Sequence, residues 1–149
     1  MTMLEPRFLE DLAVGEVSAS PQITVGEAEI IEFAKHYDPQ DMHLNAVEGL
    51  IASGWHTAAL VMRLLLDSHP LGSTPLLGLG VQDLRWPTPV RPGDVIQAET
   101  EILSIVRSRS KPGYGIVRLQ ITARNQHGEV VYLATPSLWV PCRTALTEQ

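Results

Sequence analysis

The sequence lacks several features that would place it in a special class of protein. Its 149 residues include one cysteine, Cys142, so no disulfide can form within the chain, which suits a reducing compartment. No apolar run approaches the roughly 18 residues of a membrane-spanning helix. Residues 1–10 carry acids and a proline but no continuous apolar stretch, so we expect no secretory signal. These absences predict a soluble, cytoplasmic protein.

Positive charge is also scarce. Eleven Lys and Arg stand against 17 Asp and Glu, which gives a formal net charge of −6 at pH 7. Such a chain lacks the positive field that attracts nucleic acids or anionic membranes, although a local basic patch can still hold one anionic ligand. Apolar side chains, in contrast, make up 44% of the sequence. We therefore expect a globular protein with a single domain over residues 1–149.

The first quarter of the chain predicts a short helical turn, a strand and a helix. The turn covers residues 8–12, and residues 15–25 alternate weakly as a strand with Pro21 at an edge or bulge. Thr24 and Glu27 have the spacing of a capping box. The helix that follows carries an apolar stripe at i, i+3, i+4 and i+7: Ile30, Ile31, Phe33, Ala34 and Tyr37. It should end at Asp38, because the residue before a proline avoids helical geometry.

After a loop over residues 38–53, the chain is apolar on almost every side from Trp55 to Asp67. About 13 residues are too few to span a bilayer, so this segment predicts a buried helix. Ser53 and Gly54 occupy the N-cap region. The polar residues of the helix, His56, Arg63 and Asp67, fall on one narrow stripe. That stripe favours a buried polar network or a dimer contact for His56.

The second half of the chain has the pattern of β-structure. Strands are predicted over residues 76–86, 94–106, 114–125 and 130–140, with hairpin turns at 111–113 and 125–129. Four antiparallel strands can cover one apolar helix if the sheet wraps around it. The order of elements therefore predicts an α+β protein with a hot-dog fold, in which an antiparallel sheet surrounds a central buried helix.

The segment Tyr37-Asp38-Pro39-Gln40-Asp41-Met42-His43 concentrates reactive groups between the two predicted helices. A carboxylate and a histidine are the usual pair for moving protons at neutral pH. Imidazole titrates close to working pH, and burial can raise the pKa of a carboxylate into range. The alternative is structural: an Asp after a helix is often a turn former, and His43 can simply bind backbone.

Several motifs in order resemble those of the MaoC-like dehydratases and the related (R)-specific enoyl-CoA hydratases. They lie at residues 31–40 with His43, at 49–57, at 81–86 with 89–94, and at 108–112. The resemblance spans roughly Phe8 to Pro141. The chain departs from the family pattern at two positions, since members commonly have proline at the place of Asp41 and aspartate at the place of Asn45.

The resemblance implies the reversible hydration of a trans-2-enoyl-CoA to a 3-hydroxyacyl-CoA. Asp38 would take a proton from the water that attacks C3, and His43 would orient that water and help to protonate C2. The amide of Gly54 is our candidate for binding the thioester oxygen, although this glycine could merely let the chain turn into the helix. Ser53 would donate to the carbonyl or cap the helix. Trp55 would belong to the core or line an acyl tunnel.

Coenzyme A would enter as part of the substrate, and we expect no other cofactor and no metal, because no metal-ligand spacing is present. Candidates for the coenzyme phosphates are Arg85, Arg91, Arg107, Arg109 and Lys111. Such residues can also be a solvated strand face. The resemblance implies a homodimer or a dimer of dimers whose sheets join, with phosphate ligands from the neighbouring subunit. Two rival functions stay open: an acyl-CoA thioesterase, and a non-catalytic acyl-CoA-binding subunit.

Overall fold

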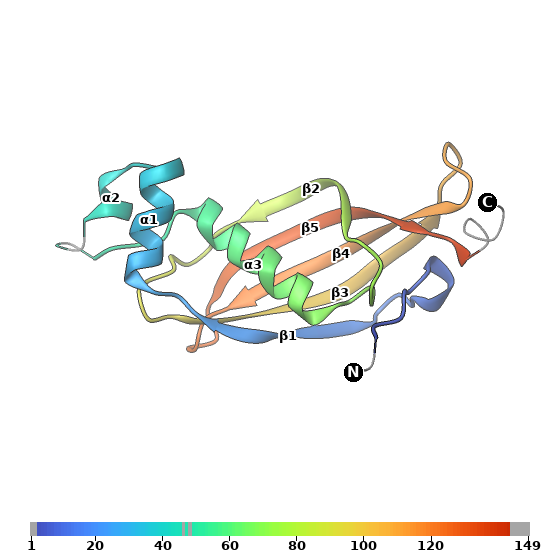
Figure 1. Cartoon of the computed structure of the whole chain (residues 1–149), viewed down its shortest axis with the longest axis horizontal. Helices are drawn as coiled ribbons and strands as arrows, with labels where there is room; N and C mark the ends of the chain where they lie inside the picture. Colours follow the sequence, from blue (N-terminus) through green and yellow to red (C-terminus); the bar gives the residue numbers. More distant parts are fainter. Residues whose placement is uncertain (1–2, 46, 48, 144–149) are drawn as a thin grey trace.

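The computed structural model describes residues 3–45, 47 and 49–143, and its main feature is one five-stranded antiparallel sheet (Figure 1). The strands are paired in the order β1-β3-β4-β5-β2. Their bounds are β1 Val17–Thr24, β2 Leu77–Arg85, β3 Val95–Arg107, β4 Tyr114–Arg124 and β5 Val130–Pro141. All five strands were predicted from their alternation, and the fold is the expected α+β hot-dog arrangement.

The longest helix, α3 (Gly54–Ser68), lies across the sheet, which curves around it (Figure 1). Two further helices, α1 (Glu27–Tyr37) and α2 (Asp41–Leu44), sit together at one end of the sheet, next to the start of α3. The opposite end carries the β3–β4 hairpin and both ends of the described chain. In the described part of the chain, no helix has the length and apolar character needed to cross a membrane.

Helix α3 is held by its inner face, where Val61, Leu64 and Leu65 are buried against the sheet. Each such side chain stabilises the fold by roughly 1.5–3 kcal/mol when it leaves water. The outer face differs from the prediction of burial on almost every side, since Trp55, Met62 and Leu66 are 60%, 50% and 48% exposed. A single subunit leaves this face of α3 uncovered.

Three details of the N-terminal half also differ from the sequence prediction. Thr24 is the last residue of β1, where it pairs with Val95, so the predicted capping box is wrong. Helix α1 begins instead at Glu27, with Gly26 as an N-cap that lacks a side-chain hydrogen bond. Tyr37 is 76% exposed although it lies on the predicted apolar stripe. The predicted loop contains the short helix α2.

Strand β1 is an edge strand with a bulge, as Pro21 predicted. Its register with β3 shifts between Ala19 and Gln22. Proline has no N–H to donate to the ladder, so the strand must be interrupted there. The Ser20 hydroxyl accepts the N–H of Ala98 at 2.9 Å, and the side chain of Gln97 donates to the Ser20 carbonyl. These contacts keep β1 attached across the interruption.

A second core cluster fills the sheet beyond the end of α3, where the N-terminal segment covers it. Leu9, in the 3-10 turn η1 (Leu9–Asp11), and Leu12 pack with Val117, Leu138 and buried neighbours from the sheet. Gly115 is glycine for this reason, because any Cβ at that position would collide with the side chain of Leu9. The short helical turn predicted at residues 8–12 is thus confirmed and closes the sheet.

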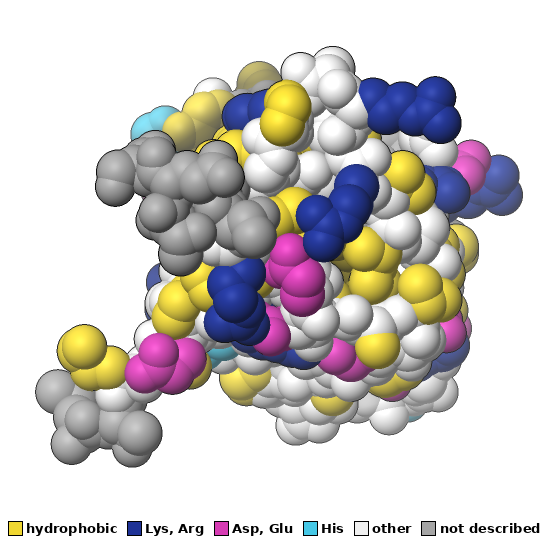
Figure 2. All heavy atoms as spheres, turned by 90° about the vertical axis from the view of Figure 1, so that its right-hand side faces the viewer, with side chains coloured by type: hydrophobic (Ala, Val, Ile, Leu, Met, Phe, Trp, Pro, Cys, Tyr) yellow, Lys and Arg dark blue, Asp and Glu magenta, His cyan; other side chains and the backbone are white. Residues whose placement is uncertain are grey.

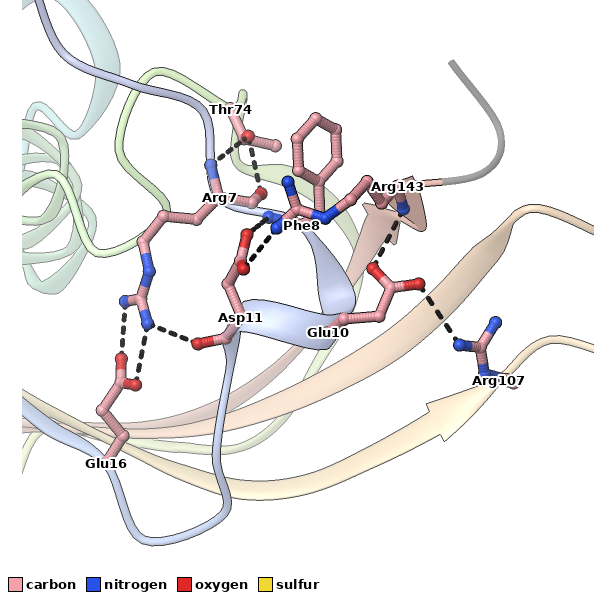
Figure 3. Close-up of polar contacts among 8 residues, drawn as sticks. All are labelled: Arg7, Phe8, Glu10, Asp11, Glu16, Thr74, Arg107 and Arg143. Carbon is pink, nitrogen blue, oxygen red and sulfur yellow. Dashed lines mark hydrogen bonds and ion pairs between the residues drawn. The ribbon is translucent and has the colours of Figure 1, made fainter. Parts of the chain in front are cut away.

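Polar contacts tie this N-terminal segment to the rest of the molecule (Figure 3). The Arg7 guanidinium donates to both carboxylate oxygens of Glu16, at 2.6 and 2.8 Å, and also to the carbonyls of Pro70 and Asp11. Paired N–H donors on one carboxylate give an ion pair with defined geometry. The Arg7 side chain lowers the pKa of the Glu16 carboxyl through these bonds, so the pair is charged at neutral pH.

We expect Arg7→Leu to lower the free energy of unfolding by about 1 kcal/mol, since a half-exposed ion pair is worth less than that and the freed carbonyls add to the loss. Arg63→Leu is the matched control, because the Arg63–Asp67 pair within α3 is far more exposed and has no polar contact with another element in the described part of the chain. It should change stability by less than about 0.5 kcal/mol. Urea unfolding at pH 7 measures both, and equal losses would contradict the assignment.

Candidate active site

Asp38 and His43 come together at the end of the sheet that carries α1 and α2. Asp38 ends helix α1, as its position before Pro39 predicted, and His43 lies in α2. The Oδ2 atom of Asp38 is 3.3 Å from Nε2 of His43, and both side chains are largely buried. The two groups that the sequence analysis selected therefore form a pair.

A backbone carbonyl group fixes the orientation of the His43 ring. Its Nδ1 lies 2.7 Å from the carbonyl oxygen of Ile51. A carbonyl can only accept, so Nδ1 carries the proton and donates, and Nε2 is directed at Asp38. The N–H of Ile51 in turn donates to the carbonyl of Met42. This backbone contact joins the loop before α3 to α2 and sets the tautomer of the imidazole.

The Asp38 carboxylate is ionised at neutral pH, because hydrogen bonds hold its pKa below the usual value of an aspartate. The side chain of Gln40 donates to Oδ1, and this bond lowers the pKa of Asp38 most strongly. The nearby Ser53 hydroxyl lowers the pKa of Asp38 further, and these two donors outweigh the effect of burial. Asp38 is therefore present as a base rather than as an acid.

A cavity of about 320 Å³ opens onto this pair. Its apolar wall contains Trp55, Trp86 and Val131, and its polar wall contains Asp38 and His43. The remaining lining residues come from the loops around α2, the start of α3 and the segment after β2: Gln40, Met42, Ile51, Ala52, Gly54, Thr57, Thr88, Pro89 and Val90. A small group with one polar end would find both kinds of contact there.

Gly54 lies at the first position of α3 and lines the cavity. A Cβ at this position would stand 2.7 Å from the ring of Trp86, so the packing of Trp86 requires glycine. The first amides of a helix have no intrahelical acceptor. Among the described residues, no carbonyl or side chain accepts the Gly54 N–H, which leaves a free donor at the positive end of the helix dipole.

Trp55 and Ser53 flank Gly54 but differ in their exposure to solvent. Trp55 is exposed rather than part of the core, and its ring meets Trp86 edge to face at 5.2 Å. The two indoles form the rim of the cavity. Ser53 is fully buried, with an exposure of 0%, and does not line the cavity. Its proposed contact with a substrate carbonyl would need the site to rearrange.

The five basic candidates divide between the two ends of the sheet. Arg85 and Arg91 flank a segment of which Trp86, Thr88, Pro89 and Val90 line the cavity. Arg107, Arg109 and Lys111 lie at the β3–β4 hairpin, and β3 is about 40 Å long at roughly 3.3 Å per residue. They are therefore far from Asp38 of the same chain. Figure 2 looks onto that end and shows Lys and Arg side chains around its rim, with Asp and Glu among them.

Two of the three hairpin residues already have partners within the chain. Arg107 donates to Glu10 at 3.2 Å, and the Lys111 ammonium stands 4.2 Å from the centre of the Tyr114 ring. Asp41, one of the two departures from the family pattern, does not line the cavity of Asp38 and His43. It lines a separate hollow with Met42, Asn45, Val47 and Gly49.

His56 does not form the polar network suggested by its stripe on α3. Arg63 and Asp67 pair with each other in solvent, whereas His56 is buried and stacks on Phe33 of α1, with ring centres 4.8 Å apart. Its Nδ1 has no hydrogen-bond partner among the described residues. Burial lowers the pKa of His56, and the charge of Glu29 opposes this only in part. The ring is therefore neutral and links α1 to α3.

Residues 11–125 match the model of the MaoC-like domain. The match covers most of the chain and includes every residue of the cavity except Val131. The chain belongs to the MaoC-like dehydratase family. The resemblance inferred from the separate motifs is thereby confirmed.

Solved structures agree with this family. A MaoC-like dehydratase from Rhodospirillum rubrum is 44% identical, covers 91% of this chain and 97% of its own, and gives a TM-score of 0.83. The (R)-hydratase of A. caviae involved in PHA biosynthesis is 26% identical, with coverages of 89% and 99% and a TM-score of 0.71. A conserved hypothetical protein of Mycobacterium tuberculosis with a double hot-dog fold is 16% identical over 92% of this chain and 44% of its own, with a TM-score of 0.72, which shows the fold alone.

Three residues at the site were given no role from the sequence. Gln40 donates to Asp38, the carbonyl of Ile51 orients His43, and Trp86 packs over Gly54. Gln40 could have been found, because it follows Asp38 by two positions in a turn. The other two are brought to the site by the path of the chain and leave no local signal.

Protonation of buried His56 predicts a pH-dependent stability. Because its pKa is lower in the folded chain than in the unfolded one, the unfolded chain binds more protons once the pH falls below about 6.5. Stability is thus complete above that pH and declines below it, by at most about 1.4 kcal/mol per pH unit for one proton. His56→Phe keeps the stack on Phe33 and should remove this part of the decline between pH 7.5 and 5.5.

Urea unfolding at several pH values measures the decline. His127→Gln, at an exposed turn, is the matched control for the loss of one histidine. An unchanged slope in His56→Phe would show that the ring does not titrate on unfolding as its burial requires.

Proposed function

We propose that the protein is an acyl-thioester hydratase or dehydratase that reversibly adds water to a trans-2-enoyl-CoA. The observation that carries this proposal is the pairing of Asp38 with His43 at the edge of a cavity, with Nδ1 of His43 already bound to backbone. Family membership supports the class of reaction, since related structures are described as a dehydratase and an (R)-hydratase. The choice of substrate is our own inference.

Asp38 Oδ2 and His43 Nε2 are two acceptors 3.3 Å apart, so one water can donate to both. The water oxygen would then attack C3 of the enoyl group while Asp38 receives the proton. The same proton is returned to C2 with the help of His43, so that C3 gains a hydroxyl, C2 gains a hydrogen and the pair ends unchanged. Dehydration follows the same steps in reverse.

Electron density moves onto the thioester oxygen as water attacks C3. The unoccupied N–H of Gly54 at the start of α3 would stabilise that charge, because its donor and the helix dipole act together. The ring of Trp86 over Gly54 prevents a side chain from filling this place. No cofactor besides the coenzyme A of the substrate enters these steps.

A second copy of the chain is part of the proposal. Strand β2 is at the edge of the sheet, and Leu77, Leu79 and Val81 on it are about half exposed. An apolar groove of about 380 Å³ separates β2 from the exposed side of α3, where Met62 lies. An unpaired apolar edge of this kind favours pairing with another strand. We infer that two copies join their sheets through β2.

Such a dimer would bring the basic hairpin to a catalytic site. A strand paired with its own copy about a twofold axis must run antiparallel to it, so each end of one sheet lies next to the opposite end of the other. Strands β5 and β2 separate β4 from the edge, a distance of about 10 Å. Arg109 and Lys111 of one subunit would then bind coenzyme phosphates at the partner's site, and Arg85 and Arg91 those at their own.

Asp38→Asn should lower kcat/KM for crotonyl-CoA hydration by about 10²-fold or more, because it keeps the shape of the side chain and removes the base. His43→Gln should have an effect of similar size. The assay follows the loss of the enoyl-thioester absorbance, with circular dichroism to verify the fold. Asp41→Asn is the control, since Asp41 lines a different hollow and should leave kcat/KM within about threefold.

Three results would overturn the proposed reaction. Near wild-type turnover by Asp38→Asn would remove the base from the mechanism. Release of free thiol without a 3-hydroxyacyl product would identify a thioesterase. Binding of crotonyl-CoA by the wild type with no turnover at any pH would identify a non-catalytic acyl-CoA-binding subunit.

Val81→Lys should convert the dimer to a monomer, because an unpaired ammonium would be placed in the apolar groove beside the joined β2 strands. Val17→Lys is the matched control: Val17 lies on β1, the opposite edge strand, and each of the two valines is 55% exposed. The control should remain dimeric. Light scattering after size-exclusion chromatography measures the mass, and a dimer that survives Val81→Lys but not Val17→Lys would place the interface at β1.

A further inference from the structure

The apolar groove between helix α3 and strand β2 lies next to the candidate active-site cavity. On the helix, Thr57 lines the cavity and the next residue, Ala58, lines the groove. On the sheet, Val131 and Tyr132 stand in the same relation. The groove follows α3 from Ala58 to Leu65, a length of about 10 Å at about 1.5 Å per residue. A chain attached at the cavity can therefore extend into the groove.

The groove is open because strand β2 has no side chain at Gly78. Gly78 pairs with Leu138, which is buried and lines the groove. Paired residues of neighbouring strands project to the same face of a sheet, so a side chain at Gly78 would enter the groove. A Cβ there would meet no atom within 4 Å. Neither packing nor a left-handed backbone requires glycine at this position, so its effect is to leave the groove unfilled.

Tyr132 is the polar side chain of an otherwise apolar wall. The other described residues that line the groove are Ala, Val, Leu, Ile, Met, Pro or Gly. Tyr132 is 7% exposed, and its hydroxyl has no hydrogen-bond partner in the described part of the chain. The side-chain polar atoms that are sealed without a partner there belong to Ser53 and His56. The Tyr132 hydroxyl is not sealed, so it keeps contact with the groove that the residue lines.

A phenol at this position has a cost that phenylalanine would avoid. Burial raises the pKa of Tyr132, so its hydroxyl is protonated at neutral pH and can donate. A donor surrounded by apolar groups destabilises the fold unless an acceptor binds its proton. A ligand with an acceptor oxygen at this level of the groove would supply the missing partner.

We propose that the groove holds the acyl chain of the substrate and that Tyr132 is a specificity-determining residue, which selects a chain with an oxygen atom in its tail. This inference rests on the proposed function and names its substrate class: trans-2-enoyl-CoA esters whose tail carries a keto or hydroxyl group. The second copy of the chain at β2 would cover the groove where Met62 and Val81 are exposed, and would leave Tyr132 inside it.

The first test compares trans-2-octenoyl-CoA with its 6-oxo and 7-oxo analogues. The wild type should use at least one oxo analogue as well as trans-2-octenoyl-CoA or better. Tyr132→Phe keeps the ring and removes the hydroxyl. It should lower kcat/KM for that oxo analogue by about tenfold or more, because the ketone would be buried without a donor, and leave trans-2-octenoyl-CoA within about threefold.

Tyr114→Phe is the matched control for the loss of one phenol hydroxyl. Tyr114 is the first residue of β4, at the hairpin end of the sheet, and does not line the groove. This variant should leave kcat/KM for all three thioesters within about threefold. A tenfold preference of the wild type for trans-2-octenoyl-CoA over both oxo analogues, or an equal change for all three thioesters in Tyr132→Phe, would overturn the role of Tyr132.

The second test fills the groove. Gly78→Leu should lower kcat/KM for trans-2-octenoyl-CoA by about tenfold or more and leave crotonyl-CoA, whose short chain ends in the cavity, within about threefold. Crotonyl-CoA is thus the control within the same variant. If Gly78→Leu does not fold, Gly78→Val, whose β-branched side chain suits a strand, takes its place. Equal losses for the two thioesters would show that the groove does not hold the acyl chain.

Binding of saturated thioesters, which cannot be hydrated, separates this inference from the proposed function. Calorimetric titration with octanoyl-CoA and its 6-oxo and 7-oxo analogues should show about tenfold weaker binding of one oxo analogue to Tyr132→Phe, with octanoyl-CoA within about threefold. A wild type that binds in this way without hydrating crotonyl-CoA refutes only the proposed function. A wild type that hydrates crotonyl-CoA but does not bind octanoyl-CoA or its oxo analogues refutes only the groove and the role of Tyr132.

Discussion

The constraint on which the structure depends is the burial of one face of α3. Fifteen residues of helix cannot hide Val61, Leu64 and Leu65 by themselves, so the sheet curves around them. The curvature leaves the ends of the helix at the ends of the sheet. Its first turn, with unpaired amides, therefore lies next to α1 and α2, and the position of the Asp38–His43 pair follows from the packing of a helix on a sheet.

Much of the fold could be predicted because its signals are local. The alternation of apolar and polar residues in the second half of the chain predicted the bounds of four strands to within one or two residues. Pro21 and Pro39 predicted a bulge and a helix end. The capping box failed because Thr24 has a stronger partner in strand β3 than in a helix start. Exposure of Trp55 and Tyr37 could not be read from the chain, since apolar residues look alike whether their own subunit or something else covers them.

The residues of the candidate site also separate into those that a local sequence pattern reveals and those that it does not. Asp38 and His43 are five positions apart, so a pattern of residues reveals them. Their supports come from other parts of the chain: Ile51 lies eight residues after His43, and Trp86 follows strand β2. The pKa of Asp38 depends on where Gln40 and Ser53 point, which no spacing rule specifies. The two residues of the candidate pair could be named in advance, but the hydrogen bonds and the pKa shift that the structure gives them could not.

The closure of the second core by both ends of the chain has a consequence for synthesis. Glu10 accepts the N–H of Arg143, a separation of 133 residues, and Leu9 packs with residues of β5. During translation the N-terminal segment leaves the ribosome first, yet its docking surface is completed last. Contacts of such long range make folding slow. The apolar turn at Leu9 and Leu12 must therefore stay exposed until β5 has been synthesised.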